Sequence, residues 1–384
     1  MLSTAVLAPR SNTCSNRAMR WDGQKTTGQP DGALPGLALA GLQRSVRTPE
    51  FAGVTFHEVH AKSALNKVPE ASAMPFRWTV NPMRGCLHAC TYCFARPTHE
   101  YLGLGPDEDF QTQIVVKTNV AEVLAAELRR RSWAHEHVAL GTNTDPYQRA
   151  EGRYALMPGI IGALAHSGTP LSLLTKGTLL RRDLPLLVEA AGEVGVSVAV
   201  SLAIGDEELQ QAMEPGTPTP RARLALIRAV RDAGLPCTVM VAPVMPWLTD
   251  STDHLDGLFR DLAEAGASGV SVIPLHLRGP VRPLMLRWLA EHRPALVAKY
   301  RRLYGDGAYV PEEYRRWLSD RVRPLRRRHG LDLPEVPTTD PVAGGTAGVA
   351  TPAPWRFRPR QAAEVPASLL PGVVQAGVVQ PALF

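Results

Sequence analysis

Three cysteines, Cys86, Cys90 and Cys93, lie within eight residues of the chain and form the pattern C-x3-C-x2-C. Thiolates are ligands for zinc, copper(I) and iron–sulfur clusters. An iron–sulfur cubane normally takes four cysteine ligands, so three leave one iron open to bind a substrate or a cofactor. The alternative is a structural zinc site completed by His88 or a remote histidine, although such sites usually combine two separated Cys/His pairs.

The cysteine spacing, with Tyr92 immediately before the third cysteine, resembles the signature of the radical S-adenosylmethionine (SAM) enzymes. The resemblance implies that the three thiolates hold a [4Fe–4S] cluster and that SAM chelates the fourth iron. One electron, from an external donor of the flavodoxin or ferredoxin type, then cleaves SAM to methionine and a 5′-deoxyadenosyl radical, which abstracts hydrogen from the substrate. It also implies that Tyr92 packs on the cluster and adenine, and that Phe94 presents its backbone to adenine.

The elements that position these cysteines follow a repeating pattern. A strand is predicted at 76–81 from its alternation and its β-branched and aromatic content, and it ends at the cysteine loop. Further strands alternate with helices of amphipathic spacing, several of which end at glycine. The predicted strands are 137–140, 171–175, 196–202, 237–242 and 270–275, and the predicted helices are 120–131, 154–166, 183–192, 220–234, 251–266 and 284–292.

This alternation predicts right-handed βαβ units and a parallel sheet, either doubly wound or a partial TIM barrel. The resemblance to radical SAM enzymes favours the second, an open (β/α)6 barrel over residues 51–293. In TIM-type barrels the chemistry lies at the C-terminal ends of the strands. Polar residues at those ends are therefore the candidates for the site.

Two such candidates follow the second and third predicted strands. The run Thr142, Asn143, Thr144 and Asp145 resembles the family motif that binds the amino group of SAM, with ordinary turn chemistry as the alternative. In proteins resembling spore photoproduct lyase, a Thr-Lys pair meets the SAM carboxylate, which assigns that role to Lys176. A solvated surface lysine is the alternative.

Four more candidates lie further along the chain, at later strand ends or at the helix start that follows. Ser201 matches the family's contact to the SAM ribose, or is a core serine bonded to backbone. Arg223 could hold SAM or substrate, or pair with Glu214. His276 and Arg278 close the sixth strand and could contact an anionic substrate.

The segments 94–101 and 141–153 resemble an actinobacterial-type branch of the photolyase-like radical SAM proteins, a branch that implies no activity of its own. The chain departs from spore photoproduct lyase in one respect. That enzyme has a hydrogen-donating cysteine at about the end of the second strand, whereas 141–145 contains none. Repair of thymine photodimers by that mechanism is therefore not expected. Cys237 opens the fifth strand at the opposite end and is interpreted as a buried thiol.

The composition of the chain limits its binding partners and its cellular compartment. The formal net charge is +6, which favours polyanions without naming one. Five cysteines with no disulfide pattern indicate a reducing compartment, and no apolar run is long enough to span a membrane. A cytoplasmic protein is predicted.

The ends of the chain differ from its middle. Residues 1–50 are predicted to be a mobile arm, and residues 294–332 a helical extension. Its second helix, 312–329, carries a run of arginines that Pro324 interrupts. This basic run either contacts a phosphate backbone or forms a solvated face. Residues 333–384 are predicted to be a disordered Pro/Ala-rich tail. Its last residues, including Gln380, Leu383 and Phe384, resemble the peptides by which bacterial DNA-repair and replication proteins bind the sliding clamp.

Two functional hypotheses follow. The first is a radical SAM enzyme that acts on a nucleic acid or a substrate associated with one. The second is a zinc- or cluster-containing nucleic-acid-binding module without radical chemistry.

Overall fold

The computed structural model describes residues 39, 41–69, 72 and 74–333. Its main sheet has seven strands in the order β11-β10-β9-β8-β7-β4-β3. Neighbours from β4 to β11 are parallel, and β3 (Leu65–Lys67) pairs with β4 antiparallel at one edge. The parallel strands are β4 (Trp78–Val80), β7 (Val138–Leu140), β8 (Leu171–Thr175), β9 (Val196–Ser201), β10 (Cys237–Val244) and β11 (Gly269–Pro274).

The spatial order of the parallel strands follows their order in the chain, which is the order of a TIM-type barrel and not of a doubly wound sheet. The predicted partial barrel is therefore confirmed. Within the described residues β4 and β11 do not pair, so the sheet stays open.

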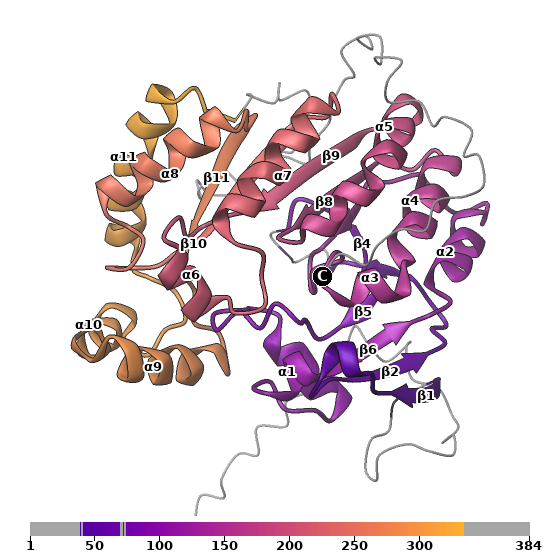
Figure 1. Ribbon diagram of the computed structural model, residues 1–384, viewed down its shortest axis with the longest axis horizontal. Coiled ribbons are helices and arrows are strands. Elements are labelled where there is room, and N and C mark those ends of the chain that lie inside the picture. The colour runs from indigo at the N-terminus through magenta and orange to yellow at the C-terminus, as the bar shows by residue number, and fades with distance from the viewer. Residues whose placement is uncertain (1–38, 40, 70–71, 73, 334–384) are drawn as a thin grey trace, which may run out of the picture.

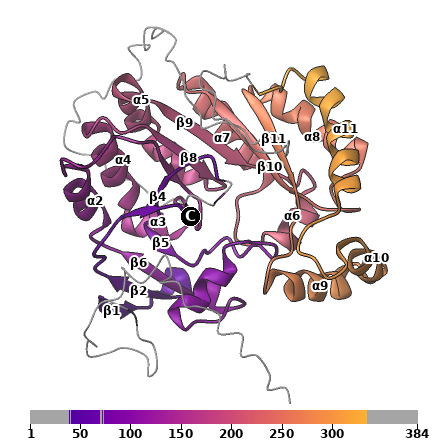
Figure 2. The same cartoon turned by 180° about the vertical axis from the view of Figure 1, so that it is seen from behind.

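Helices between the strands cover one side of this sheet (Figures 1 and 2). They are α2 (Val120–Leu128), α4 (Leu156–His166), α5 (Leu184–Glu193), α7 (Pro220–Asp232) and α8 (Thr252–Glu264). Their apolar faces and the sheet form one core, because buried side chains such as Leu124, Ile160 and Phe259 pack against strand residues. Thr219 and Ser251 cap α7 and α8 by accepting hydrogen bonds from backbone N–H groups of their first turns.

A second sheet was not predicted. Its four strands have the order β1-β2-β6-β5, with β1 (Leu42–Val46), β2 (Thr55–Val59), β5 (Met83–Arg84) and β6 (Gln113–Lys117). Strand β1 lies inside the range predicted as a mobile arm, so the ordered part begins before residue 51 and that boundary is wrong. Residues 1–38 and 40 lie outside the described residues.

Several short helices were also missed. The helix α6 (Glu207–Met213), capped by Asp206, follows β9, and α3 (Ala150–Tyr154) follows β7. The 3-10 helix η3 (Arg96–Leu102) and α1 (Asp109–Thr112) come after the cysteine loop. Two further 3-10 helices are η2 (Pro49–Phe51) and η4 (Thr178–Asp183).

The C-terminal helices pack on the barrel. The helix α9 (Val281–His292) is followed by α10 (Pro294–Tyr304) and α11 (Glu312–Arg328), and α11 continues through Pro324, as predicted. Leu318 and Val322 of α11 belong to the main core, whereas Tyr300 of α10 shares a second core with Cys90 and Tyr92. The predicted tail and its residues Gln380, Leu383 and Phe384 lie outside the described residues. None of the described helices is both long and apolar enough to cross a membrane.

Candidate functional site

The cysteine loop begins directly after β5. Gly85 has φ +78°, and a Cβ at this position would lie 2.9 Å from the carbonyl oxygen of Phe110. The backbone N–H of Cys86 donates to that same oxygen over 2.8 Å. Glycine is thus required where the chain turns from the second sheet into the loop, because only glycine adopts this backbone without strain.

Arg96 holds the loop from inside. Its side chain is buried and donates to the carbonyl oxygens of Cys90 at 3.0 Å and Ala89 at 3.2 Å. It also donates to the carbonyls of Pro106 and Asp107, at 3.1 and 2.7 Å. The guanidinium fork satisfies several carbonyl groups that a tight loop cannot pair by itself. Sequence reasoning missed this residue because its acceptors lie in two separate segments.

A second clamp comes from the loop after α6. The N–H of Thr91 donates to the carbonyl of Met213 over 2.9 Å, and the N–H of Gly216 donates to that of His88 over 3.2 Å. The two backbones are so close that a Cβ on Gly216 would lie 1.9 Å from the carbonyl oxygen of Leu87. The position of the cysteines therefore depends on α6, an element that was not predicted.

The three thiols are free, and those of Cys86 and Cys90 are buried. Burial raises the pKa of Cys90 and Cys93, and charge on Cys86 raises both further, while Lys176 lowers both. Within the described part of the chain, no three or more His, Cys, Asp or Glu side chains are already gathered in a metal-binding arrangement. The case for a metal centre therefore rests on the chemistry of the donor atoms. Three thiolates in one loop repel one another, and a soft cation that replaces the thiol protons stabilises them.

His88 is paired with Asp145. Its Nδ1 atom lies 3.3 Å from the carboxylate, and both side chains are buried. Burial alone would lower the pKa of His88, but Asp145 and Cys86 raise it to about 10. Burial alone would likewise raise the pKa of Asp145, but His88 and the hydrogen bonds lower it to about 2. This ion pair links the cysteine loop to the end of β7.

Asp145 also fixes the end of β8. It accepts hydrogen bonds from Thr175 Oγ1 at 2.5 Å, from the N–H of Lys176 at 2.6 Å and from the N–H of Tyr147 at 2.9 Å. Its carboxylate is thus used by protein donors, which favours positioning over the predicted direct contact to SAM.

The other members of the predicted 142–145 run differ among themselves. Thr144 Oγ1 donates to the carbonyl of Met83 over 3.1 Å. Thr142 Oγ1 and Asn143 Nδ2 are buried and have no hydrogen-bond partner among the described residues. A buried polar atom without a partner is destabilising by about 1–3 kcal/mol. These two atoms are therefore available to hydrogen-bond with a further polar group.

Lys176, Ser201 and Tyr92 meet beside the cysteines. Lys176 Nζ donates to Ser201 Oγ over 3.0 Å and lies 5.8 Å from the centroid of the Tyr92 ring. Burial would lower the pKa of Lys176, but Cys90 and Glu214 raise it above its usual value. The structure thus brings together residues predicted from three separate strand ends or loops.

Glu214 and Arg223 resolve an alternative left open by the sequence. Both are fully buried and form an ion pair, with Arg223 also donating to the carbonyl of Ser201 over 3.1 Å. The hydroxyl of Tyr92 donates to Glu214. Burial would raise the pKa of Glu214, but Arg223 and Lys176 keep it below its usual value. Arg223 and Lys176 therefore both face Glu214, but only Arg223 forms an ion pair with it.

Phe94 lies at the rim. Its side chain is 55 % exposed, and its ring centroid is 6.2 Å from that of His276. The cation of Arg278 lies over Tyr309, 5.0 Å from its ring centroid. Cys237 is fully buried at the N-terminal start of β10, away from these strand ends.

Comparison with known proteins identifies the family. Residues 80–270 match the model of the radical SAM superfamily. An uncharacterised protein of Mycobacterium tuberculosis is 67 % identical over 317 residues, which cover 82 % of this chain and 93 % of that protein. An uncharacterised protein of Mycobacterium bovis matches with the same identity and coverage.

Solved structures support the same fold. Spore photoproduct lyase complexed with dinucleoside spore photoproduct has a TM-score of 0.55 at 17 % identity, covering 71 % of this chain and 79 % of that one. A mutant of that lyase with bound AdoMet and the dinucleoside has a TM-score of 0.52 at 18 % identity, covering 68 % and 76 %. At such low identity the likeness shows the fold alone. The matching family model makes the chain a member of the radical SAM superfamily and an enzyme of the radical SAM class.

Proposed function

We propose that Cys86, Cys90 and Cys93 bind a [4Fe–4S] cluster and that the enzyme uses SAM to abstract a hydrogen atom from its substrate. The cluster supplies the electron that cleaves SAM to methionine and a 5′-deoxyadenosyl radical. One observation carries the proposal. A loop with three free thiols is fixed by Arg96, by the His88–Asp145 pair and by Gly216, directly beside Lys176.

The surrounding residues are proposed to hold SAM. Lys176, with Ser201 beside it, meets the carboxylate, because its buried ammonium donates to the Ser201 hydroxyl and forms no ion pair among the described residues. Thr142 offers its unpaired buried hydroxyl oxygen to the amino group, the unpaired N–H donor of Asn143 suits an acceptor such as the carboxylate, and Thr144 and Asp145 hold their loop in place. Ser201 is also the candidate for the ribose.

Three aromatic and cationic residues complete this assignment. Tyr92 and the backbone of Phe94 are assigned to the adenine side. Arg223 acts through Glu214 and the carbonyl of Ser201, because its guanidinium is already paired within the protein.

The substrate is proposed to be a nucleic acid, supported by the basic composition and by the arginines of α11. An external one-electron donor of the flavodoxin or ferredoxin type completes the reaction. The segment 141–145 contains no cysteine, so hydrogen return from a thiol at that strand end is not part of the proposal. Binding of the sliding clamp by Gln380, Leu383 and Phe384 stays a separate prediction.

Anaerobic reconstitution with iron and sulfide tests the cofactor. We expect a brown protein that forms 5′-deoxyadenosine from SAM when dithionite is added. A colourless protein that binds one zinc would instead support the nucleic-acid-binding module without radical chemistry.

Substituting Lys176→Ala tests the SAM site. Loss of a hydrogen bond to a charged group weakens binding by about 1.5–3 kcal/mol, or about 10- to 100-fold. Iron content should stay unchanged, because Lys176 donates to Ser201 and not to the loop backbone. If iron is lost together with SAM binding, the role assigned to Lys176 is wrong.

A further inference from the structure

A second cavity lies outside the cysteine site, between the loop that follows β10 and α11. Its volume is about 490 Å³, and its lining residues are Trp247, Asp250, Ser251, Tyr314, Trp317 and Arg321. The two indoles are unusually open to solvent for tryptophan, at 44 % exposed for Trp247 and 41 % for Trp317. The loop leaves β10 at its C-terminal end, which is the edge of the sheet that also carries Lys176 and Ser201.

The protein holds both indoles in place. Trp247 has φ +58°, its backbone N–H donates to the Asp250 carboxylate over 2.9 Å, and its ring centroid lies 5.7 Å from that of Tyr300. Tyr314 donates to the same carboxylate over 2.7 Å, and its ring lies 5.3 Å from that of Trp317. A non-glycine residue at positive φ persists only where its surroundings enforce it. The exposed indoles are therefore part of a built scaffold.

Cations border both rings. The guanidinium of Arg321 lies 4.0 Å from the centroid of the Trp317 ring and donates to the carbonyl of Asp250 over 2.9 Å. Lys299 Nζ lies 5.8 Å from the centroid of the Trp247 ring.

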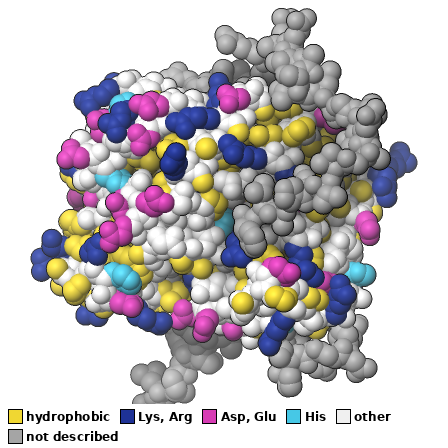
Figure 3. Space-filling view, viewed as in Figure 1, with side chains coloured by type: hydrophobic (Ala, Val, Ile, Leu, Met, Phe, Trp, Pro, Cys, Tyr) yellow, Lys and Arg dark blue, Asp and Glu magenta, His cyan; other side chains and the backbone are white. Residues whose placement is uncertain are grey.

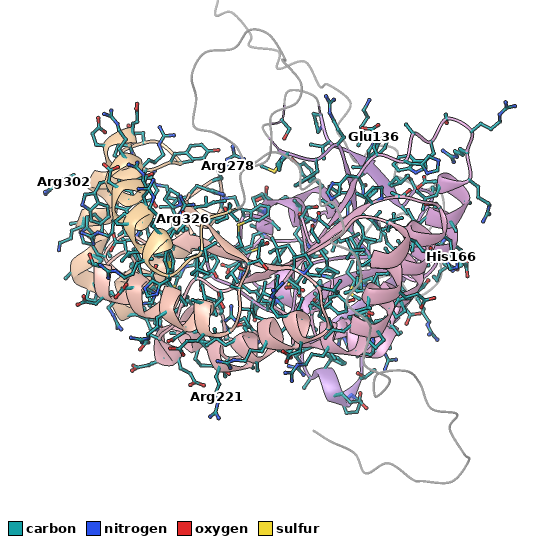
Figure 4. The ribbon with its side chains drawn as sticks, turned by 90° about the horizontal axis from the view of Figure 1, so that it is seen from above. Glu136, His166, Arg221, Arg278, Arg302 and Arg326 are labelled. Atoms are coloured by element: carbon teal, nitrogen blue, oxygen red, sulfur yellow. The ribbon has the colours of Figure 1, made fainter. Side chains whose placement is uncertain are left out.

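The two helices behind these cations are basic. The helix α10 has three cationic side chains and no carboxylate. The helix α11 has seven arginines against three carboxylates, and four of those arginines pair with carboxylates of α11 or of neighbouring segments, namely Arg316, Arg323, Arg326 and Arg328. Figure 3 shows Lys and Arg side chains along the left edge, where Figure 1 places α10 and α11. Figure 4 shows Arg302 and Arg326 at this same end of the molecule, opposite His166.

We propose that this cleft binds single-stranded nucleic acid, with a base stacked on Trp247 or Trp317 and the phosphates held by the cations of α10 and α11. Aromatic platforms beside a positive groove are how proteins bind single strands without sequence preference. A ligand bearing a quaternary ammonium group would also fit an aromatic cage. Here Arg321 and Lys299 already lie against the two indoles, and the Asp250 carboxylate that lines the cleft already accepts hydrogen bonds from Trp247 and Tyr314. An anionic strand is therefore favoured over a further cation.

The proposal deepens the proposed function, because it supplies a holding site for the nucleic-acid substrate near the strand ends. It does not require the radical reaction to occur. Nucleic-acid binding is measured without SAM or reductant. A protein that does not bind nucleic acid in the cleft is therefore distinguished from one that does not cleave SAM.

The test uses the full reconstituted chain and a fluorescent oligothymidylate. Trp317→Ala removes one stacking platform, so its affinity for the oligonucleotide should be about fivefold or more lower than that of the wild type. The affinity of the Trp247→Ala/Trp317→Ala double variant should be lower still. Trp317→Tyr should restore most of the affinity. Tyr101→Ala is the matched control, since Tyr101 is a comparably exposed aromatic, at 51 %, outside the cleft. Iron content and unfolding temperature should be unchanged in all variants.

A direct readout separates stacking from charge. Oligothymidylate should quench tryptophan fluorescence in the wild type and less in the double variant, whereas an abasic oligonucleotide should not quench it. The proposal is overturned if the double variant binds as tightly as the wild type, or if the wild type binds thymidylate and abasic strands equally. It is also overturned if the cleft binds a trimethyl-lysine peptide instead of either strand.

Discussion

Adding one methyl group at Gly216 should disable the cysteine loop without disturbing the rest of the fold. In Gly216→Ala the new Cβ would lie 1.9 Å from the carbonyl oxygen of Leu87 and 3.0 Å from its carbonyl carbon. Both neighbours belong to the backbone, so no side chain can rotate away. The two loops must separate.

The size of the effect follows from this geometry. Real Cβ atoms keep at least 3.0 Å from such a neighbour, so the loops must move apart by about 1 Å or more. The cysteine loop is held on its other sides by Arg96 and by the His88–Asp145 pair, and it has little room to follow. A misplacement of about 1 Å lowers a rate by about 10²-fold. We expect a loss of that order in SAM cleavage, together with reduced iron content.

The assay compares Gly216→Ala with Gly192→Ala, in which the new Cβ meets nothing within 4 Å. Gly192 lies in the last turn of α5, so this control should be stabilised by up to about 1 kcal/mol and keep its iron. Each variant is assayed for iron per chain, for the rate of 5′-deoxyadenosine formation and for unfolding temperature. Wild-type iron content and rate in Gly216→Ala would refute the role assigned to the loop after α6.

Three further predictions concern buried charge. Lys117 is buried without a hydrogen-bond partner among the described residues, and burial lowers its pKa from 10.5 to about 7. Because the pKa of Lys117 is lower in the folded state than in the unfolded state, the protein loses stability as the pH falls from 10.5 towards 7. In urea unfolding at pH 7, Lys117→Met should therefore be about 2–4 kcal/mol more stable than the wild type. Equal stability of the two proteins would refute this. Glu214→Gln leaves Arg223 buried without its counter-ion, and we expect a loss of about 3–5 kcal/mol in the same assay. Arg96→Lys removes the fork that holds the carbonyls of Ala89 and Cys90, and iron per chain should fall; unchanged iron would contradict the clamp.

The sequence determined the local features of this protein. The thiols are neighbours in the chain, so their spacing indicates a shared ligand without knowledge of the fold. The alternation of strands and amphipathic helices predicted the parallel barrel for a similar reason, because the periods of 2.0 and 3.6 residues are local properties. Lys176 and Ser201 became candidates because they stand at the C-terminal ends of parallel strands, which meet at one edge, and because the chain resembles the radical SAM enzymes there.

Only the tertiary structure decided what holds the site together. Strand β5 has two residues and all five residues of β2 are buried, so neither shows the alternation that reveals a strand. Glu214 could pair with Arg223 or face a ligand, and the choice depends on burial of both side chains at once. Trp247 and Trp317 line one cleft although they are far apart in the chain, because α11 packs on α8 and β11. Contacts between distant segments depend on how whole elements pack, and no local pattern of residues encodes that packing.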